Sequence, residues 1–203
     1  MNLHTEQDPE QLLQAARQDE GAALGQLLES YRNYLTLLAR VQIGRRLQGK
    51  IDAADLVQET FLAAYRDFAQ FRGTTEPALA CWLRQILACK LTDLVWRYYG
   101  AQRRDVRLER HLADELDRSS KTLGLVAQQS SPSQHLSRRE QAVLLAEAIK
   151  RLPQAYGEVI ILRHLEGLSF PGIAERMNRS LDSVEKLWMR GLTRLRRLLG
   201  APS

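Results

Sequence analysis

Acidic and polar side chains at residues 55–59 form the arrangement in this chain that most resembles a catalytic pair. Asp55, Gln58 and Glu59 fall at positions i, i+3 and i+4 of the stretch DAADLVQETFLAAYRDFAQFRG, so on a helix they share one face. Paired carboxylates can act as general acid and base. No histidine, nucleophile or glycine-rich loop accompanies them. The pattern therefore favours a binding surface or an ordinary solvated face, and we expect that the protein is not an enzyme.

The residues that bind metals or form disulfides are few and scattered. No metal-ligand spacing is found among the histidines, which are His4, His111, His135 and His164. Cys81 and Cys89 lie eight residues apart, and about 12 Å along one helix is too far for a disulfide. We predict two buried free thiols, no metal site and no cofactor.

The charge of the chain is unevenly distributed. The formal net charge is +5 with a pI near 9.5, which favours an acidic partner. Residues 1–30 are acidic, whereas residues 82–110 and the tail after Lys186 are basic. The polar start is unlike a signal peptide, and no apolar run approaches the roughly 20 residues that span a bilayer. We expect a cytoplasmic protein without membrane insertion.

These side chains are positioned by a fold that we predict to be all-α. Glycine and proline are sparse inside the periodic segments, and the only strand-like run, Val159 to Leu162, reads as part of a buried helix. Helices are expected near residues 9–18, 21–47, 52–70, 77–98, 138–150, 153–166, 169–177 and 181–199. A stretch rich in Ser, Gln and Thr, residues 117–134, reads as a linker between two small helical domains.

The last of these helical pairs predicts a helix-turn-helix. Ser169 and Ser180 can each cap a helix, and Asn178 tolerates the left-handed backbone that a tight turn needs. An apolar stripe follows at spacings of three and four: Val184, Leu187 or Trp188, Gly191, Leu195 and Leu198. A basic stripe lies opposite it: Lys186, Arg190, Arg194 and Arg197.

A basic stripe opposite an apolar one is typical of a helix that packs on its own domain and meets DNA with its outer face. A solvated basic face and a membrane-surface helix are the alternatives. On the DNA interpretation, bases are read by the first half of the helix and the arginines further along hold phosphates. The candidate residues are Ser180, Asp182, Ser183, Glu185, Lys186, Met189, Arg190 and Arg194.

Two separate stretches resemble the bacterial sigma-70 family of RNA polymerase sigma factors. The stretch DLVQETFLAAYRDFAQFRG is similar to the helix that binds core polymerase, and WLRQILACKLTDLVWRYY is similar to the helix that engages the promoter −10 element. LPQAYGEVIILRHLEGLSFPGIAERMNRSLDSVEKLWMRGLTRLRRLL resembles the domain that reads the −35 element. Because a linker joins the two domains directly, the chain looks like the extracytoplasmic-function group.

The resemblance implies a division of the chain. An acidic segment (1–20) precedes a region 2 domain (21–105), a linker (106–137) and a region 4 helix-turn-helix domain (138–199). It implies that Asp55, Gln58 and Glu59 contact the clamp helices of the largest polymerase subunit. It also implies that the protein contacts the flap region of core polymerase. The loop from Phe71 to Trp82 matches the one that receives a flipped −10 base. The residues expected to meet −10 DNA are Cys89, Lys90, Asp93, Arg97, Arg103 and Arg104.

The implied function is a sigma factor that binds core polymerase, directs it to −10 and −35 elements and promotes DNA opening. A stand-alone helix-turn-helix regulator is the alternative. Many relatives are held inactive by an anti-sigma protein, so such a partner is an open expectation. Glu185 and Lys186 depart from the residues common in the family at those positions. The −35 preference therefore cannot be copied from a relative, and Glu185 either reads a cytosine or points to solvent.

Overall fold

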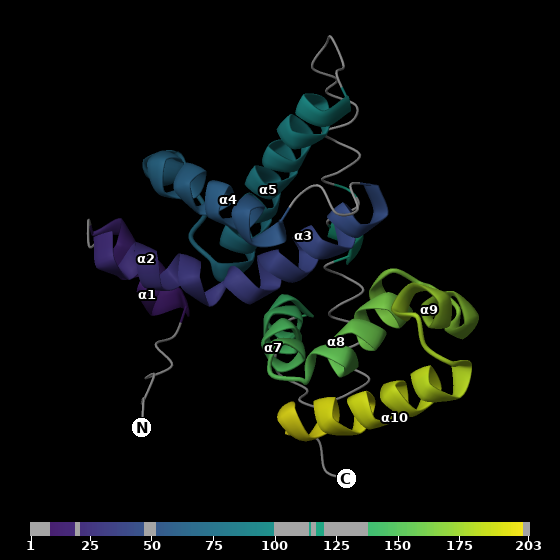
Figure 1. Cartoon of the computed structure of the whole chain (residues 1–203). Helices are drawn as coiled ribbons and strands as arrows, with labels where there is room; N and C mark the ends of the chain where they lie inside the picture. The colour runs from purple at the N-terminus through teal and green to yellow at the C-terminus, as the bar shows by residue number, and fades with distance from the viewer. Residues whose placement is uncertain are drawn as a thin grey trace.

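The computed structural model describes residues 9–18, 21–46, 52–99, 114, 117–119 and 138–200, and within them all regular structure is helical (Figure 1). The elements are α1 (Pro9–Arg17), α2 (Gly21–Ser30), α3 (Arg32–Arg46), α4 (Ala53–Asp67), η1 (Phe68–Gln70), α5 (Glu76–Tyr99), α7 (Arg138–Lys150), α8 (Gln154–Ile160), η2 (Ile161–Leu165), α9 (Phe170–Met177) and α10 (Leu181–Leu198). The predicted all-α class is confirmed. Arg103, Arg104 and most of the expected linker lie outside the described residues.

The first hydrophobic core is built by α1 to α5. Buried leucine, valine and alanine side chains from all five helices meet there, including Leu13, Leu27, Leu38, Val57 and Leu83. The amphipathic helix α1 packs against α2 and contacts α5, so the packing begins ahead of the domain boundary expected at residue 21. Burial of one apolar face is the main contribution to the stability of such short helices.

The single helix predicted for residues 21–47 is wrong, because the structure breaks it at Tyr31. Ser30 Oγ donates to the carbonyl of Leu27 at 2.7 Å, and the Tyr31 N–H donates to the carbonyl of Leu28 at 3.1 Å. These three-residue steps tighten and end α2. Tyr31 is fully buried, and its hydroxyl lies 3.0 Å from Glu76 Oε1 at the start of α5. The buried Tyr31 therefore joins the break between α2 and α3 to the start of α5.

A buried arginine joins the first core to a residue of the expected linker. Arg84 on α5 is only 4% exposed, and its guanidinium donates to the Tyr34 hydroxyl at 3.1 Å and to Asp117 Oδ1 at 3.0 Å. Burial opposes its charge, but Tyr34, Cys81 and Asp117 together outweigh burial and raise the pKa of Arg84. Loss of Asp117 would leave a buried charge with one partner fewer, which is a costly state.

The second hydrophobic core is built by α7 to α10. The run Val159 to Leu162 is helical and buried, as predicted, and passes from α8 into the single π-helical turn η2. Gly191 is the point where α10 approaches α8, because a Cβ there would lie 3.2 Å from Ile160 Cδ1 and 3.4 Å from Tyr156 Cβ. A side chain at this position would require these neighbours to shift by a few tenths of an ångström, so glycine suits this close approach in the middle of a long helix.

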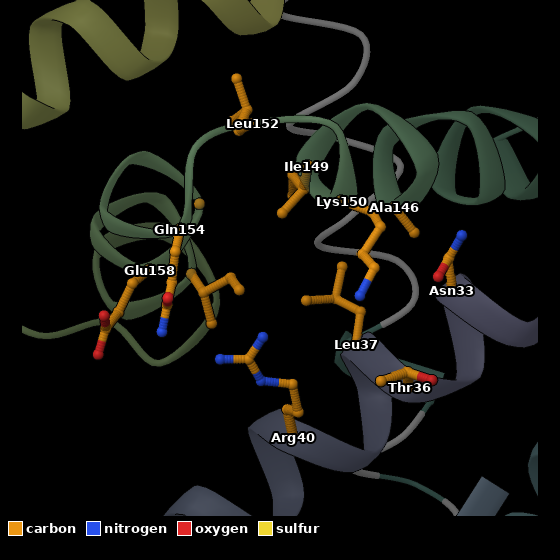
Figure 2. Close-up of a pocket in the computed structure, with 12 residues that line it drawn as sticks. Asn33, Thr36, Leu37, Arg40, Ala146, Ile149, Lys150, Leu152, Gln154 and Glu158 are labelled. Atoms are coloured by element: carbon orange, nitrogen blue, oxygen red, sulfur yellow. The ribbon is translucent and has the colours of Figure 1, made fainter. Parts of the chain in front are cut away.

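The two helical units meet where α3 faces α7 and α8 (Figure 1). Asn33 Nδ2 donates to Glu147 Oε1 at 2.7 Å across this boundary. Beside it lies a cavity of about 350 Å³, floored by apolar side chains such as Leu37 and Ile149. Figure 2 shows the Arg40 and Lys150 side chains extending into this cavity from opposite units. The boundary therefore combines buried apolar side chains with a polar contact and a cavity.

Candidate functional site

The turn between α9 and α10 has the geometry that the sequence predicts. Ser169 Oγ accepts from the Gly172 N–H and Ser180 Oγ accepts from the Ser183 N–H, each at 3.3 Å. Asn178 is left-handed, with φ 51° and ψ 52°. The following N–H, of Arg179, donates to the Ala174 carbonyl at 2.9 Å and closes the end of α9. Both predicted caps and the turn are confirmed.

The inner face of α10 is fixed on its domain. Val184, Gly191 and Leu195 are buried, as the apolar stripe predicts. The stripe is wrong at Leu198, which is 39% exposed. There the helix borders an open hollow of about 670 Å³ that Leu198 lines together with Tyr156 and three arginines. Leu198 therefore contributes little to the second core, whereas Leu195 in the same turn is part of it.

A histidine and a tryptophan also hold α10 in place. Trp188 Nε1 donates to His164 Nε2 at 3.1 Å, and the two rings stack with centroids 6.2 Å apart. The edge of Phe170 meets Trp188, and Arg163 lies over Phe170 with 4.7 Å to the ring centroid. Burial, helped by the charge of Arg163, lowers the pKa of His164. A neutral His164 is the form that accepts the tryptophan proton.

The outer face of α10 is basic and open to solvent. Lys186 pairs with Asp182 at 2.7 Å, a surface ion pair that contributes little to stability. Arg190, Arg194 and Arg197 are exposed and form no ion pair with a described residue. Met189 is 61% exposed on the same side. Of the other candidates, Ser180 and Glu185 are exposed, whereas Ser183 is half-buried by its place in the first turn.

The polar cluster on α4 is also brought to the surface as predicted. Asp52 begins the helix, its carboxylate accepting from the Ala54 N–H at 2.9 Å. Asp55, Gln58 and Glu59 are exposed, and neither carboxylate forms an ion pair with a described residue. The buried side of the helix carries Val57, Phe61 and Ala64, which leaves the polar cluster free for a partner.

Two apolar side chains that the sequence reasoning missed continue this surface. Leu62 is 65% exposed and Tyr65 is 56% exposed. They follow Gln58 and Glu59 at helical spacings of three, four, six and seven, so all lie along one side of α4. This helical spacing, together with the inward positions of Phe61 and Ala64, would have predicted that Leu62 and Tyr65 are exposed. A large exposed leucine and tyrosine beside carboxylates are typical of a surface that binds another protein.

The candidate residues on α5 share an exposed face. Cys89, Asp93 and Arg97 are exposed and Lys90 is half-buried. The prediction of two buried thiols is wrong, because Cys89 is exposed and Cys81 only partly covered. Eight residues turn an α-helix by about 80°, so the two cysteines lie on adjacent parts of the α5 surface and are covered to different extents. The loop before α5 carries a ring cluster in which Phe71 stacks on Trp82 with centroids 4.9 Å apart and Phe68 contacts both rings.

The described part of the chain contains neither a membrane span nor a metal centre. No helix there is long and apolar enough to cross a membrane. No group of three or more histidine, cysteine or acidic side chains in those residues is arranged to hold a metal ion.

Comparison with known families matches both helical units. Residues 30–98 match the family described as Sigma-70 region 2, and residues 142–195 match Sigma-70, region 4. The ECF RNA polymerase sigma-E factor of Haemophilus influenzae is 30% identical over 173 residues, which cover 85% of each chain. The chain belongs to the sigma-70 family of RNA polymerase sigma factors.

Other relatives of this sigma factor are similar over most of their length. The RNA polymerase sigma factor YlaC of Bacillus subtilis is 31% identical over 155 residues, which cover 76% of this chain and 80% of YlaC. A solved structure of CnrH in complex with the cytosolic domain of CnrY is 26% identical, covers 97% of this chain and all of that chain, and has a TM-score of 0.37. The region 2 match includes α4 and α5, and the region 4 match includes the helix-turn-helix.

Proposed function

We propose that the activity of this family, directing RNA polymerase to promoters, is divided here between α4, which binds the polymerase, and α5 and α10, which bind DNA. The observation that carries the proposal is the contrast between two outward helix faces. One is acidic and partly apolar, and the other is basic with three arginines that form no ion pair with a described residue. DNA is a polyanion, so only the second face suits it.

The polymerase contact is proposed for the side of α4 that carries Asp55, Gln58 and Glu59. Exposed carboxylates can form bidentate pairs with arginines on a partner helix, and these pairs fix orientation. Leu62 and Tyr65 extend the same side and supply apolar area, which provides most of the binding free energy in protein interfaces. The family resemblance names the clamp helices of the largest subunit as the partner. A contact between region 4 and the flap is a prediction of the same kind.

The −35 contact is proposed for the outer face of α10. In helix-turn-helix proteins the first turns of the second helix reach base edges. Ser180, Glu185 and Met189 are exposed near that end, and Arg190 follows one turn later. Because Lys186 is paired with Asp182, a base contact by either side chain requires that pair to open or to act together. Arg194 lies one turn further along and is assigned to phosphate.

The −10 contact is proposed for α5 and the loop before it. Cys89, Lys90, Asp93 and Arg97 lie along one side of α5, and Phe71 of the loop stacks on Trp82 of the same helix. Extruding a base costs a few kcal/mol, which a shaped pocket and backbone contacts must offset. The family resemblance assigns this role to the loop, and it also names Arg103 and Arg104, which lie outside the described residues. An anti-sigma partner stays a prediction.

The test is transcription from purified parts. Sigma-free core polymerase is mixed with the protein and a library of promoter fragments, and the transcripts are sequenced to find shared −10 and −35 elements. We expect initiation at a small set of related sequences. The stand-alone regulator alternative predicts instead that the free protein binds DNA tightly and sequence-specifically, and that it adds no specific initiation to core polymerase. That result would overturn the proposal.

A further inference from the structure

The N-terminal helix α1 contacts the loop that precedes α5. Arg17, the last residue of α1, donates from Nη2 to the backbone carbonyl of Gly73. Its guanidinium carbon also lies 5.9 Å from the centroid of the Phe71 ring. One side chain thus holds the loop in two ways, through its backbone and through an aromatic ring. Residue 17 lies ahead of residues 30–98, which match the family's region 2.

The segment that Arg17 holds is tightly folded onto the ring cluster. A Cβ at Gly73 would lie 2.4 Å from Phe71 Cζ and 2.6 Å from Ala78 Cβ, so only glycine fits there. Phe71 in turn stacks on Trp82 of α5. Phe71 is therefore held by Trp82 of α5. Arg17 of α1 contacts both the Phe71 ring and the Gly73 carbonyl. A shift of α1 would be transmitted to both.

Arginine suits this position better than lysine. Its planar guanidinium can donate a hydrogen bond in its plane while a ring packs near it, and an ammonium group lacks this flat geometry. Arg17 is exposed, and the carbonyl of Gly73 and the ring of Phe71 are the partners that the structure gives it. Phe71 is partly buried and packs against the first hydrophobic core, whereas the Arg17 side chain is exposed, so Arg17 contributes to the shape of the loop more than to the core.

We propose that Arg17 is a positioning residue for the loop that receives the −10 base, so that α1 sets how well the loop is formed before DNA arrives. This inference rests on the proposed function of that loop. A preformed loop avoids the entropy cost of ordering at the moment of binding. Loss of Arg17 therefore weakens opening of the −10 region and its base selectivity, and leaves the α4 and α10 contacts unchanged.

The experiment compares Arg17→Ala, Arg17→Lys and Gln14→Ala in the full chain. Gln14 is exposed on the same helix, so its variant controls for a change in α1 alone. Each protein is assembled with core polymerase on a promoter carrying a fluorescent base analogue in the −10 element. We expect Arg17→Ala to lower the equilibrium constant for opening about tenfold. The equilibrium constant of Arg17→Lys should lie between those of Arg17→Ala and the parent, and that of Gln14→Ala should equal the parental value.

A second readout separates positioning from a general loss of structure. Opening is measured on promoters with each base substitution in the −10 element. A loosened loop lowers the discrimination between the preferred and the wrong base. General destabilisation of the protein instead lowers the opening of every template by the same factor. In a double-mutant cycle, Phe71→Leu should cost less in the Arg17→Ala background than in the parent.

Two outcomes overturn the inference. The first is that Arg17→Ala opens the promoter with the same equilibrium constant and the same base selectivity as the parent. The second is a loss of core polymerase binding in Arg17→Ala equal to its loss of opening, which would mean that α1 supports only the fold. Failure of the proposed function looks different, because the parent protein itself would then bind no core polymerase or open no promoter.

Discussion

The exposed faces of α4 and α10 differ in the sign of their charge and in what lies beside that charge. On α4, Asp55 and Glu59 precede the exposed Leu62 and Tyr65. On α10, a row of arginines accompanies the exposed Met189, and Leu181 and Leu198 are exposed at the two ends of the helix. Both helices bury their opposite faces in a hydrophobic core. The similar packing leaves the two outward faces to determine which partner each helix binds.

The net charge of the chain alone would therefore indicate DNA as a partner and would not indicate the proposed protein-binding surface on α4. The net charge of +5 favours an acidic partner such as DNA, yet the best apolar surface lies beside carboxylates, away from the arginines. A protein partner is bound mainly through apolar area and a few well-placed charges, whereas DNA is bound through phosphates. A chain with both faces on separate rigid helices can bind both partners at once.

The largest expected effect on the α4 side is from Leu62→Ala. Removing a leucine that becomes buried in an interface costs about 1.5–3 kcal/mol, which is about 10- to 150-fold in affinity for core polymerase. Leu144→Ala is the matched control, because Leu144 on α7 is 46% exposed and outside both proposed surfaces. The affinity is measured by titration with labelled protein. Equal affinities for the two variants would remove Leu62 from the interface.

On the α10 side, Arg190→Ala should weaken promoter use by about 1–3 kcal/mol if the guanidinium contacts a base. The loss should then be confined to one position of the −35 element, measured on a panel of promoter variants. A uniform loss with a smaller salt dependence would assign Arg190 to phosphate. Arg151→Ala, which removes an exposed cation between α7 and α8, is the control. Activity equal to that control on every promoter would exclude Arg190.

A smaller effect is expected from Ser180→Ala, which removes the cap of α10 and no part of α4. Loss of an N-cap costs about 1 kcal/mol, and Asp restores it because its carboxylate accepts the same N–H. The thermal midpoint of the free protein should fall for Ser180→Ala and recover for Ser180→Asp. Core polymerase affinity should stay at the parental value. An unchanged midpoint in Ser180→Ala would mean that the bond to Ser183 contributes nothing measurable.

The smallest effect concerns pH and is also confined to the α10 side. The pKa of His164 is lowered in the folded protein, so folding favours its neutral form. This contribution is complete above the unfolded pKa of about 6.5 and is lost as pH falls toward the folded value. The free energy of unfolding should therefore fall faster below pH 6.5 in the parent than in His164→Gln. Denaturant titrations followed by tryptophan fluorescence check this, and identical slopes would contradict it.

The sequence was most informative where the structure is set locally. Ser169, Asn178 and Ser180 act on the two or three residues next to them, so their types alone predicted the caps and the turn. The polar cluster on α4 was likewise predicted from helical spacing. Periodicity determines which residues share a face, and a short range of sequence is enough to read it.

The errors arose where distant segments decide. The helix predicted for residues 21–47 breaks at Tyr31, whose buried hydroxyl is hydrogen-bonded to Glu76, 45 residues away. Arg84 belongs to a basic stretch, yet it is buried on Tyr34 and Asp117 and presents no charge to DNA. The burial of such a side chain depends on partners that are distant in sequence and that no local sequence pattern predicts. The same holds for Cys89, whose exposure follows from which side of α5 its neighbours cover.

The most direct test of the division between α4 and α10 is the affinity of the protein for sigma-free core polymerase at about 150 mM salt, where charge attraction is screened beyond about 8 Å. The parent is measured beside the triple variant Asp55→Ala, Gln58→Ala, Glu59→Ala and beside Arg190→Ala, all shown to be folded. We predict tight binding by the parent and by Arg190→Ala, and a loss of at least about thirtyfold in the triple variant. Parental affinity in the folded triple variant would contradict the assignment of α4 to the polymerase.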